Sequence, residues 1–416
     1  MRRFLAGIGL AGALALACAP TRAQNPLEPP DLARYLRWGP VRARPGLLLT
    51  NLGYDNNIFY GSIGPQSGDY TATLSPRLEG VVLFGDRAFF TFKEQLDWTT
   101  YRTYFDQNYW NQLGSGRLTV PLKRMGFYVD GVLNDTKERP PDQYSIRNDV
   151  RQLGLGAGIL FKVGWRTDAE VGVARSAFGY TNAEYDNRSN PDCPTIGCAL
   201  DRTERGVRAL GRYLLVGRTR LTLEWSNRDI TFSNPENGRD ATQRRLVPGL
   251  DFGLGGRLTG TFRYGWARLD SKNPAYPDYN GPVGEARLSY RFGAGTTLQA
   301  GGLRDIGFST YVATGYYENA TYDARVIQYF NRIVGVEAGG GRGQLTFPAS
   351  ASPSLPTDRI DQTTQFDGGL RLRFSENTLG RRVEYSIKLT HWTLTSNYPN
   401  IDQSRTTFGF NAIIGY

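Results

Sequence analysis

Long apolar runs are scarce in this 416-residue chain, and the one substantial run lies at its N-terminus. A membrane-spanning helix needs about 20 consecutive apolar residues, whereas 21% of this chain is charged and its mean hydropathy is −0.43. Blocks of Ala, Leu, Glu and Lys, which favour long helices, are missing as well. These absences exclude a helical membrane protein. Glycine (50 residues) and aromatic side chains (12%) are abundant instead, which argues against disorder and indicates a nearly all-β chain.

Histidine occurs only once, as His391. An outer-membrane lipid hydrolase would need a histidine paired with a serine and an orienting polar group. Ser386 and Ser396 are each five residues away, an odd spacing that places them on the opposite face of one strand. We therefore expect His391 to be an outward-facing interfacial residue, and we expect no enzyme activity.

Clusters of basic residues are also missing. The chain has 49 Lys and Arg against 39 Asp and Glu, a net charge of +10, but these residues are spread along its length. A nucleic-acid partner is therefore not expected, because such proteins concentrate basic residues on one surface. Neither zinc-ligand spacing nor a Gly-rich phosphate loop leading into a helix is found, so neither a metal nor another cofactor is expected.

The N-terminus has the features of an export signal. Met1-Arg2-Arg3 is followed by an apolar run from Phe4 to Cys18 and then by Thr21-Arg22-Ala23. This pattern predicts a secretory signal peptide over residues 1–23, with a lipoprotein modified at Cys18 as the alternative. The other cysteines, Cys193 and Cys198, are expected to form a disulfide, because the periplasm is oxidising. Residues 24–44 are Pro-rich and non-periodic, and predict a short periplasmic segment.

From residue 45 to residue 416 one pattern repeats. Segments of about 11–17 residues alternate apolar with polar or small residues, which is the period of a β-strand. In residues 70–84, for example, Tyr70, Leu74 and Leu78 share one face, while Arg77 and Glu79 lie on the other. Eighteen such segments occur, and their connections are alternately tight and long. This alternation predicts a single up-and-down antiparallel β-barrel of about 18 strands.

Strand length places this barrel in a membrane. Strands of soluble sandwiches and propellers are about 5–6 residues long, whereas about 14 residues tilted by about 40° cross a bilayer. Charged residues at mid-strand could not be buried in a dry core without a large cost. We therefore expect the apolar face to contact outer-membrane lipid and the charged face to line a water-filled lumen.

The charges on the inward face are the candidate functional set. The predicted basic lumen residues are Arg77, Lys93, Arg208, Arg212, Arg220, Arg263, Arg287, Arg291, Arg325 and Arg371. The predicted acidic ones are Glu79, Asp97, Glu224, Asp251, Glu285, Asp323, Glu337 and Asp367. These groups either brace the wall as arginine–carboxylate pairs or form a path for anionic and polar solutes. Glycines at 339–343 are expected to let a strand bend or to leave space in the lumen.

Both ends of the barrel resemble known proteins. The last strand is apolar on one face, with Phe408 and Phe410, and ends on the aromatic Tyr416, which is similar to the C-terminal signal that the outer-membrane barrel-assembly machinery reads. Gly53-Tyr54-Asp55-Asn56-Asn57-Ile58-Phe59, followed by Ser75-Pro76-Arg77-Leu78, resembles the opening of a β-barrel porin family. Members of that family often accompany exopolysaccharide export systems. The resemblance implies the outer membrane as the location, and a polysaccharide or a periplasmic export protein as partner remains open.

The functional prediction is therefore an outer-membrane channel for polar or anionic solutes or for polysaccharide. The alternative is a closed structural or adhesive barrel that acts through its surface loops. The long connection at 182–201 is the candidate for a loop that folds inward and narrows the lumen, and this point stays open.

Overall fold

The computed structural model describes residues 26–33, 35–61, 66–138, 148–181, 200–234, 238–308, 314–349, 357–374 and 382–415. The predicted signal peptide, the predicted disulfide between Cys193 and Cys198, and Tyr416 lie outside these residues.

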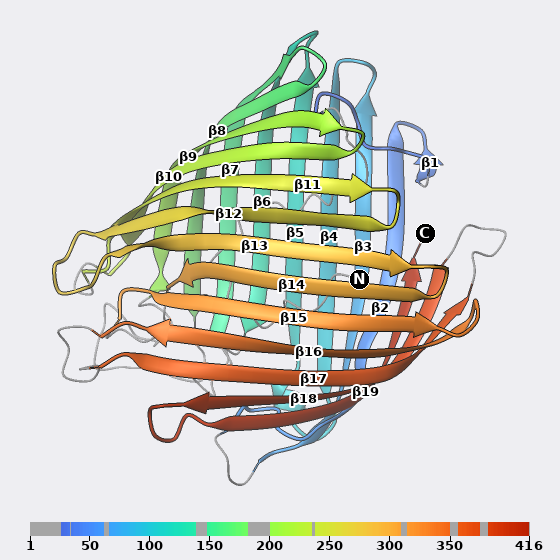
Figure 1. The fold of residues 1–416 in the computed structure, drawn as a ribbon, viewed down its shortest axis with the longest axis vertical. Coiled ribbons are helices and arrows are strands. Elements are labelled where there is room, and N and C mark those ends of the chain that lie inside the picture. The colour runs from blue at the N-terminus through green and yellow to red at the C-terminus, as the bar shows by residue number, and fades with distance from the viewer. Residues whose placement is uncertain are drawn as a thin grey trace.

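Eighteen long antiparallel strands, β2–β19, form one closed barrel (Figure 1). Each strand pairs with the next along the chain, and β19 pairs with β2 to complete the ring. The strands are β2 (Val41–Asp55), β3 (Asp69–Phe84), β4 (Ala88–Tyr101), β5 (Tyr109–Pro121), β6 (Met125–Glu138), β7 (Asn148–Val163), β8 (Thr167–Thr181), β9 (Arg202–Val216), β10 (Thr219–Phe232), β11 (Ala241–Leu254), β12 (Leu258–Ser271), β13 (Tyr279–Phe292), β14 (Thr296–Gly307), β15 (Tyr317–Tyr329), β16 (Val334–Phe347), β17 (Arg359–Phe374), β18 (Arg382–Ser396) and β19 (Gln403–Gly415). The predicted barrel and strand number are confirmed, and the first strand begins at Val41 rather than at residue 45.

A short strand, β1 (Leu36–Trp38), precedes the barrel and pairs with the start of β2. A 3-10 turn at Phe105–Gln107 is the one helical element with assigned bounds. In the part of the chain that the structure describes, helices are too short to cross a membrane.

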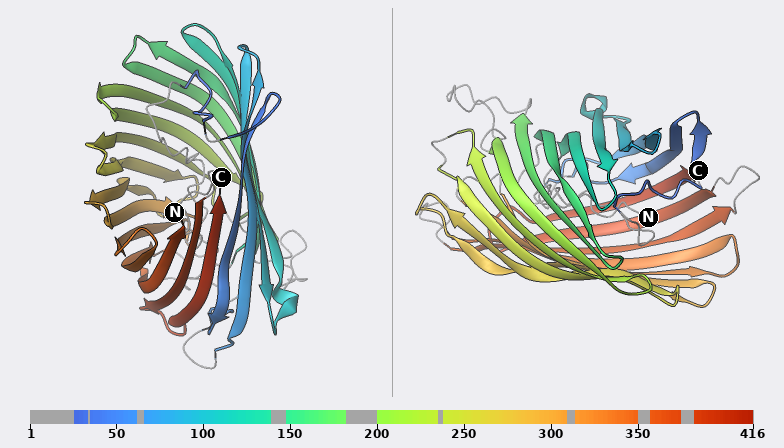
Figure 2. Two further views of the ribbon diagram at one scale, coloured as in Figure 1. Left: turned by 90° about the vertical axis from the view of Figure 1, so that its right-hand side faces the viewer. Right: turned by 90° about the horizontal axis from the view of Figure 1, so that it is seen from above.

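Tight and long connections alternate around the ring as the sequence predicts, except between β17 and β18, where the connection at 375–381 is as long as several of the long ones. The tight turns gather at one end of the barrel and the long connections at the other (Figures 1 and 2). Several tight turns contain glycine with positive φ, such as Gly85 (61°), Gly217 (57°) and Gly293 (55°), a conformation that costs a glycine little. In outer-membrane barrels the tight turns face the periplasm and the long loops face outward. We call the two ends the periplasmic and outer ends accordingly.

The two faces of the wall are distinguished by contacts between strands that are not neighbours. Arg117 on β5 binds Glu170 on β8 (2.8 Å), and Arg245 on β11 binds Asp305 on β14 (2.5 Å). Such contacts can form only on the concave side. Because side chains alternate along a strand, the opposite side chains face outward, and there large apolar residues such as Leu288 are exposed. The ion-paired charges thus lie on the concave side and the exposed apolar residues on the convex side.

Aromatic residues mark both margins of the outward face. Near the outer end, Trp98 stacks on Trp110 (centroids 5.6 Å apart) and Tyr54 contacts Tyr70 (5.3 Å). Near the periplasmic end, Tyr385 contacts both Phe374 and Phe410. Two such belts are typical of barrels whose margins lie at the membrane–water interfaces.

The Gly53–Phe59 motif closes the barrel between its first and last strands. The carboxylate of Asp55, at the end of β2, accepts hydrogen bonds from the Arg405 side chain on β19. The Asn57 side chain donates a hydrogen bond to the backbone carbonyl of Ser404 on β19 (2.9 Å). A Cβ atom at Gly53 would lie 1.9 Å from the carbonyl oxygen of Phe408, so only glycine fits there. The residues that carry the family resemblance thus have a structural role at the seam.

Candidate functional site: the lumen wall

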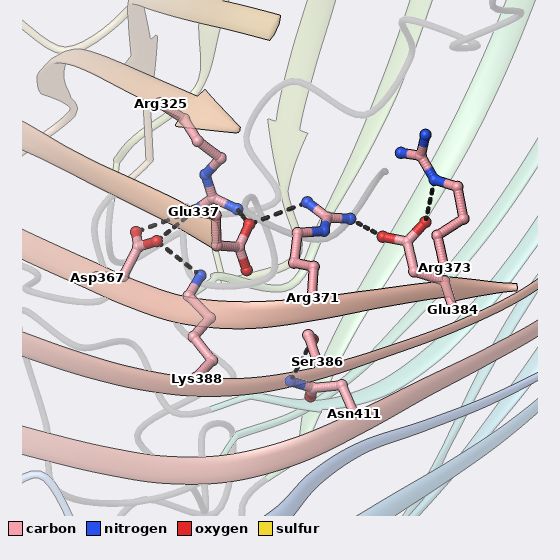
Figure 3. A network of polar contacts seen from close by, with 9 residues as sticks. All are labelled: Arg325, Glu337, Asp367, Arg371, Arg373, Glu384, Ser386, Lys388 and Asn411. Atoms are coloured by element: carbon pink, nitrogen blue, oxygen red, sulfur yellow. Dashed lines mark hydrogen bonds and ion pairs between the residues drawn. The ribbon is translucent and has the colours of Figure 1, made fainter. Parts of the chain in front are cut away.

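One network of charges joins the inward faces of β15–β18 (Figure 3). Arg325 binds Asp367 (2.9 Å) and Glu337 (3.3 Å). Arg371 binds the same Glu337 (3.0 Å) and also Glu384, and Lys388 binds Asp367 (3.1 Å). The carboxylates of Asp367 and Glu337 are almost fully buried. Four strands are therefore cross-linked by alternating charges, and these groups are held against the wall.

Glycine makes room for this network. A Cβ atom at Gly339 would lie 3.2 Å from the Asp367 carboxylate and 3.3 Å from Nε of Arg325. Gly341 and Gly343 lie on the same inward face of β16, so side chains of neighbouring strands occupy the space in front of them. The expectation that glycines 339–343 leave space in the lumen agrees with this geometry.

A second network spans β5–β10. Arg117 binds Glu170 and stacks over the ring of Tyr128 (3.7 Å). Arg212 bonds to Asp168 and lies 3.6 Å from Glu170. Arg208 on β9 also belongs to this network and binds Glu224 on β10 through two hydrogen bonds of 3.0 and 2.9 Å. These arginines are half-buried and serve to brace the wall.

A third network spans β11–β14. Arg263 bridges Glu285 (2.9 Å) and Asp251 (3.3 Å) on the strands at either side. Arg245 forms two bonds with Asp305, at 2.5 and 3.1 Å. Arginine suits such sites because its planar group binds two carboxylate oxygens at once.

Three basic residues of the predicted set remain exposed to the lumen. Lys93 lies on the inward face of β4, and Arg287 and Arg291 lie on the inward face of β13. The Arg287 side chain is 58% exposed, and its ion-pair partner Glu285 is 3.9 Å away. Inward-facing side chains would be buried in a packed interior, so their exposure indicates a solvent-filled lumen.

These exposed residues lie on opposite walls. Counting around the ring of β2–β19, β4 and β13 are half a circuit apart, and Figure 1 shows β13 in front of the strands that include β4. Lys93 lies five residues from the periplasmic end of β4, and Arg287 lies five residues from the periplasmic end of β13. Their depths in the barrel therefore match, and a solute in the lumen would pass between them.

Phe308 and Tyr316, which flank the connection between β14 and β15, contact residues of other strands at the outer end of the barrel. Phe308, directly after β14, contacts Phe232 on β10 (5.4 Å) and the Arg202 guanidinium on β9 (5.2 Å). Tyr316, directly before β15, contacts Tyr279 (5.6 Å) and is buried. Tyr316 belongs to a buried apolar cluster with residues of β10–β14: Ile230, Phe232, Ala241, Ala267, Leu269, Tyr279, Val283 and Ile306.

The inward position of Phe308 was not predicted. The sequence suggested the connection at 182–201 as one that folds inward, and residues 182–199 lie outside the described residues. Leu200, at its end, is buried beside Phe178 and close to Phe308. The signal in the sequence for the inward position of Phe308 is an aromatic residue at the start of an otherwise polar connection.

The periplasmic end also receives a segment of chain. Leu27 is buried against Tyr128 and Leu160 on the inward faces of β6 and β7. Further along, Tyr35 lies beside Arg44 of β2 (5.9 Å). The N-terminal segment thus runs from the β6–β7 wall to β2, and Leu27 is anchored inside the barrel.

Every predicted lumen residue lies on an inward-facing strand position, but their surroundings differ. Most are held in the three networks. Arg77 contacts other groups, Asp97 accepts two hydrogen bonds from Gln95, and Asp323 is exposed. Arg220 lies directly opposite Asp251 on β11. Arg117, Asp168, Glu170 and Asp305 were missed, although strand parity with outward Leu118 and Val171 would have found three of them.

Two other predicted positions lie on the outward face. His391 is exposed there, and its Nδ1 is 2.9 Å from the Thr406 hydroxyl on β19, so the predicted outward facing is correct. Phe408 and Phe410 of the C-terminal strand also face outward. Their recognition by the barrel-assembly machinery stays a prediction.

Comparison with known proteins identifies the class. The family described as "Putative beta-barrel porin 2" matches residues 37–414, and the chain belongs to that family. It is an outer-membrane, porin-like β-barrel. No curated relative matches the chain.

Solved outer-membrane porins have similar structures. The Pseudomonas aeruginosa porin OccK2 (OpdF) in complex with glucuronate is 13% identical with a TM-score of 0.49, over 90% of this chain and 97% of that chain. A BenF-like porin from Pseudomonas fluorescens is 12% identical with a TM-score of 0.48, over 90% of this chain and 98% of that chain. P. aeruginosa OccK3 (OpdO) is 14% identical with a TM-score of 0.43, over 90% and 95%.

Proposed function

We propose that this barrel is a passive channel for small polar and anionic solutes. The observation that carries the proposal is the difference between basic and acidic groups in the lumen. Lys93, Arg287 and Arg291 are exposed on two opposite walls, and Asp323 is the one exposed acid of the predicted lumen set, whereas Glu337, Asp367 and Asp251 are held by arginines. A solute in the lumen meets the exposed groups, and a low-dielectric wall strengthens their field.

The position of Phe308 and Tyr316 at the outer end favours small solutes over a polymer. Phe308 and Tyr316 occupy lumen space above β9–β13, so a polysaccharide chain would have to displace them. Export of polysaccharide therefore has less support from the geometry than passage of small solutes.

Planar-bilayer recordings test the proposal. The wild type should form a stable channel that prefers chloride over potassium, and the preference should fall on raising salt to about 1 M, where the screening length is about 3 Å. The double variant Lys93→Gln, Arg287→Gln should lose most of the preference. The outward-facing double variant Arg304→Gln, Arg342→Gln removes the same charge and should keep it.

Two results would count against the channel. If the folded protein, identified by heat-modifiable migration, never conducts above leak, the closed structural or adhesive barrel replaces it. If the barrel conducts but the Lys93 and Arg287 changes leave selectivity unaltered, the exposed residues do not set it.

A further inference from the structure

Four arginines gather on the outward face of β8–β12, near the outer end. They are Arg175 on β8, Arg205 on β9, Arg244 on β11 and Arg268 on β12, and all four are exposed. We call these four residues the arginine patch. The strands that carry it lie side by side in the front wall of Figure 1.

The patch sets like charges directly opposite one another. Arg175 pairs in register with Arg205, and Arg244 pairs in register with Arg268. The Cβ atoms of directly paired residues lie about 5 Å apart, and like charges at such positions destabilise a sheet. The two pairs are separated by β10, on which Asp229 lies directly opposite Arg205. An anion bound at either pair would offset the repulsion between its arginines.

The acids on this face neutralise only part of the charge. Asp270 binds Arg268 (2.5 Å), and Asp229 accepts a hydrogen bond from the Thr242 hydroxyl (2.9 Å). Within the described residues, Arg175, Arg205 and Arg244 have neither an ion pair nor a hydrogen bond from their side chains. Four arginines and two aspartates leave the patch net positive.

Two tryptophans, on β10 and β12, indicate how deep in the membrane the arginine patch lies. Trp225, Leu246 and Trp266 are directly opposite one another on β10, β11 and β12. Arg244 and Arg268 lie two residues nearer the outer end, and the row of Arg205 lies two residues beyond that. Two residues span about 6.6 Å of strand. Because tryptophans mark the edge of the hydrocarbon region, the arginines lie at the depth of lipid headgroups.

We propose that the arginine patch binds the phosphate groups of a phosphorylated lipid in the outer leaflet. Guanidinium groups bind phosphate oxygens in pairs, and clustered basic residues at headgroup depth attract anionic lipid. The acyl chains would lie against the exposed apolar surface below, at Leu223, Leu246 and Phe262. The inference is independent of conduction through the lumen.

Binding of lipid A to the full-length protein in neutral detergent tests the proposal. Trp225 and Trp266 adjoin the patch, so titration with bisphosphorylated lipid A should change the tryptophan fluorescence. Phosphate-free lipid A of the same acylation should bind at least tenfold more weakly. Arg205→Gln with Arg244→Gln should weaken binding of the bisphosphorylated lipid at least tenfold.

The control is Arg304→Gln with Arg342→Gln, which removes two outward arginines at the same end of the barrel. Arg304 binds Glu318 (3.0 Å) and Arg342 binds Gln362 (2.8 Å), so this control should change affinity less than twofold. Equal weakening by both double variants would overturn the proposal, because a general charge effect would then suffice.

Two further binding measurements use the wild-type protein, so they test the proposal even if the patch variant fails to fold. Equal binding of phosphate-free and bisphosphorylated lipid A would overturn the proposal, since the apolar surface alone would account for it. Binding in EDTA should be unchanged. Its loss in EDTA would assign the phosphate to a cation held by Asp229 and Asp270 and would refute direct binding by arginine.

Discussion

The cost of removing a bracing arginine should depend on how deeply its carboxylate partners are buried. Arg371 bridges Glu337 and Glu384, and the three side chains are 8%, 4% and 8% exposed. Removing one member of a buried ion pair costs about 3–5 kcal/mol. Glu337 keeps Arg325 and Glu384 keeps Arg373 at 3.9 Å, so Arg371→Gln should cost about 3 kcal/mol, at the lower end of that range.

Arg263 is the matched comparison, because it also bridges two carboxylates on neighbouring strands. Its side chain is 33% exposed, and those of Asp251 and Glu285 are 17% and 27% exposed. Solvent screens such contacts, and exposed pairs contribute about 0.2–1 kcal/mol each. Arg263→Gln should therefore cost about 1 kcal/mol in total.

Urea unfolding in lipid vesicles, followed by tryptophan fluorescence and by gel migration, measures this difference. With a slope of about 3 kcal/mol/M, the midpoint should fall by about 1 M for Arg371→Gln and by about 0.3 M for Arg263→Gln. Equal shifts, or a larger shift for Arg263→Gln, would refute the view that burial determines what each brace contributes.

Two further predictions concern topology and facing. Cysteines placed in long connections, as in Asn234→Cys and Asp278→Cys, should react with a membrane-impermeant maleimide on intact cells. Cysteines placed in tight turns, as in Gly217→Cys and Ala294→Cys, should react only after the outer membrane is permeabilised. Equal labelling of both sets would contradict the assigned orientation. Leu288→Arg should lower the free energy of unfolding by about 2–4 kcal/mol, because a cation at mid-depth contacts lipid, whereas Ser289→Arg should be tolerated beside Arg287 and Arg291. A greater loss of folded protein for Ser289→Arg would reverse the facing of β13.

The strands and their facing could be predicted because both depend on local pattern. A strand of the barrel wall has lipid on one side and water on the other, so every second residue is apolar. On β12, for example, Tyr264 and Trp266 face outward and Arg263 faces the lumen. Tight turns add a local signal through glycines such as Gly217 and Gly255. Neither signal requires knowledge of distant contacts.

The partners of the charges could not be predicted, because they depend on curvature. Arg117 and Glu170 are separated by two intervening strands, as are Arg245 and Asp305. The register of every strand between them fixes whether their side chains meet. The inward position of Phe308 was missed for a related reason. A connection lacks the alternation of apolar and polar residues that shows which way the side chains of a strand face.

The electrostatic character of the lumen follows from these partners more than from the number of charges. The sequence gives only a small excess of basic over acidic residues on the inward face, which by itself predicts weak selectivity. In the structure Glu337 and Asp367 are covered by Arg325, Arg371 and Lys388, and a covered pair presents little field to a passing ion. Lys93 and Arg287, being exposed on facing walls, act on that ion directly. An arginine that braces the wall therefore also removes an acid from the path, and in this way a nearly balanced set of charges would produce the anion preference that we propose.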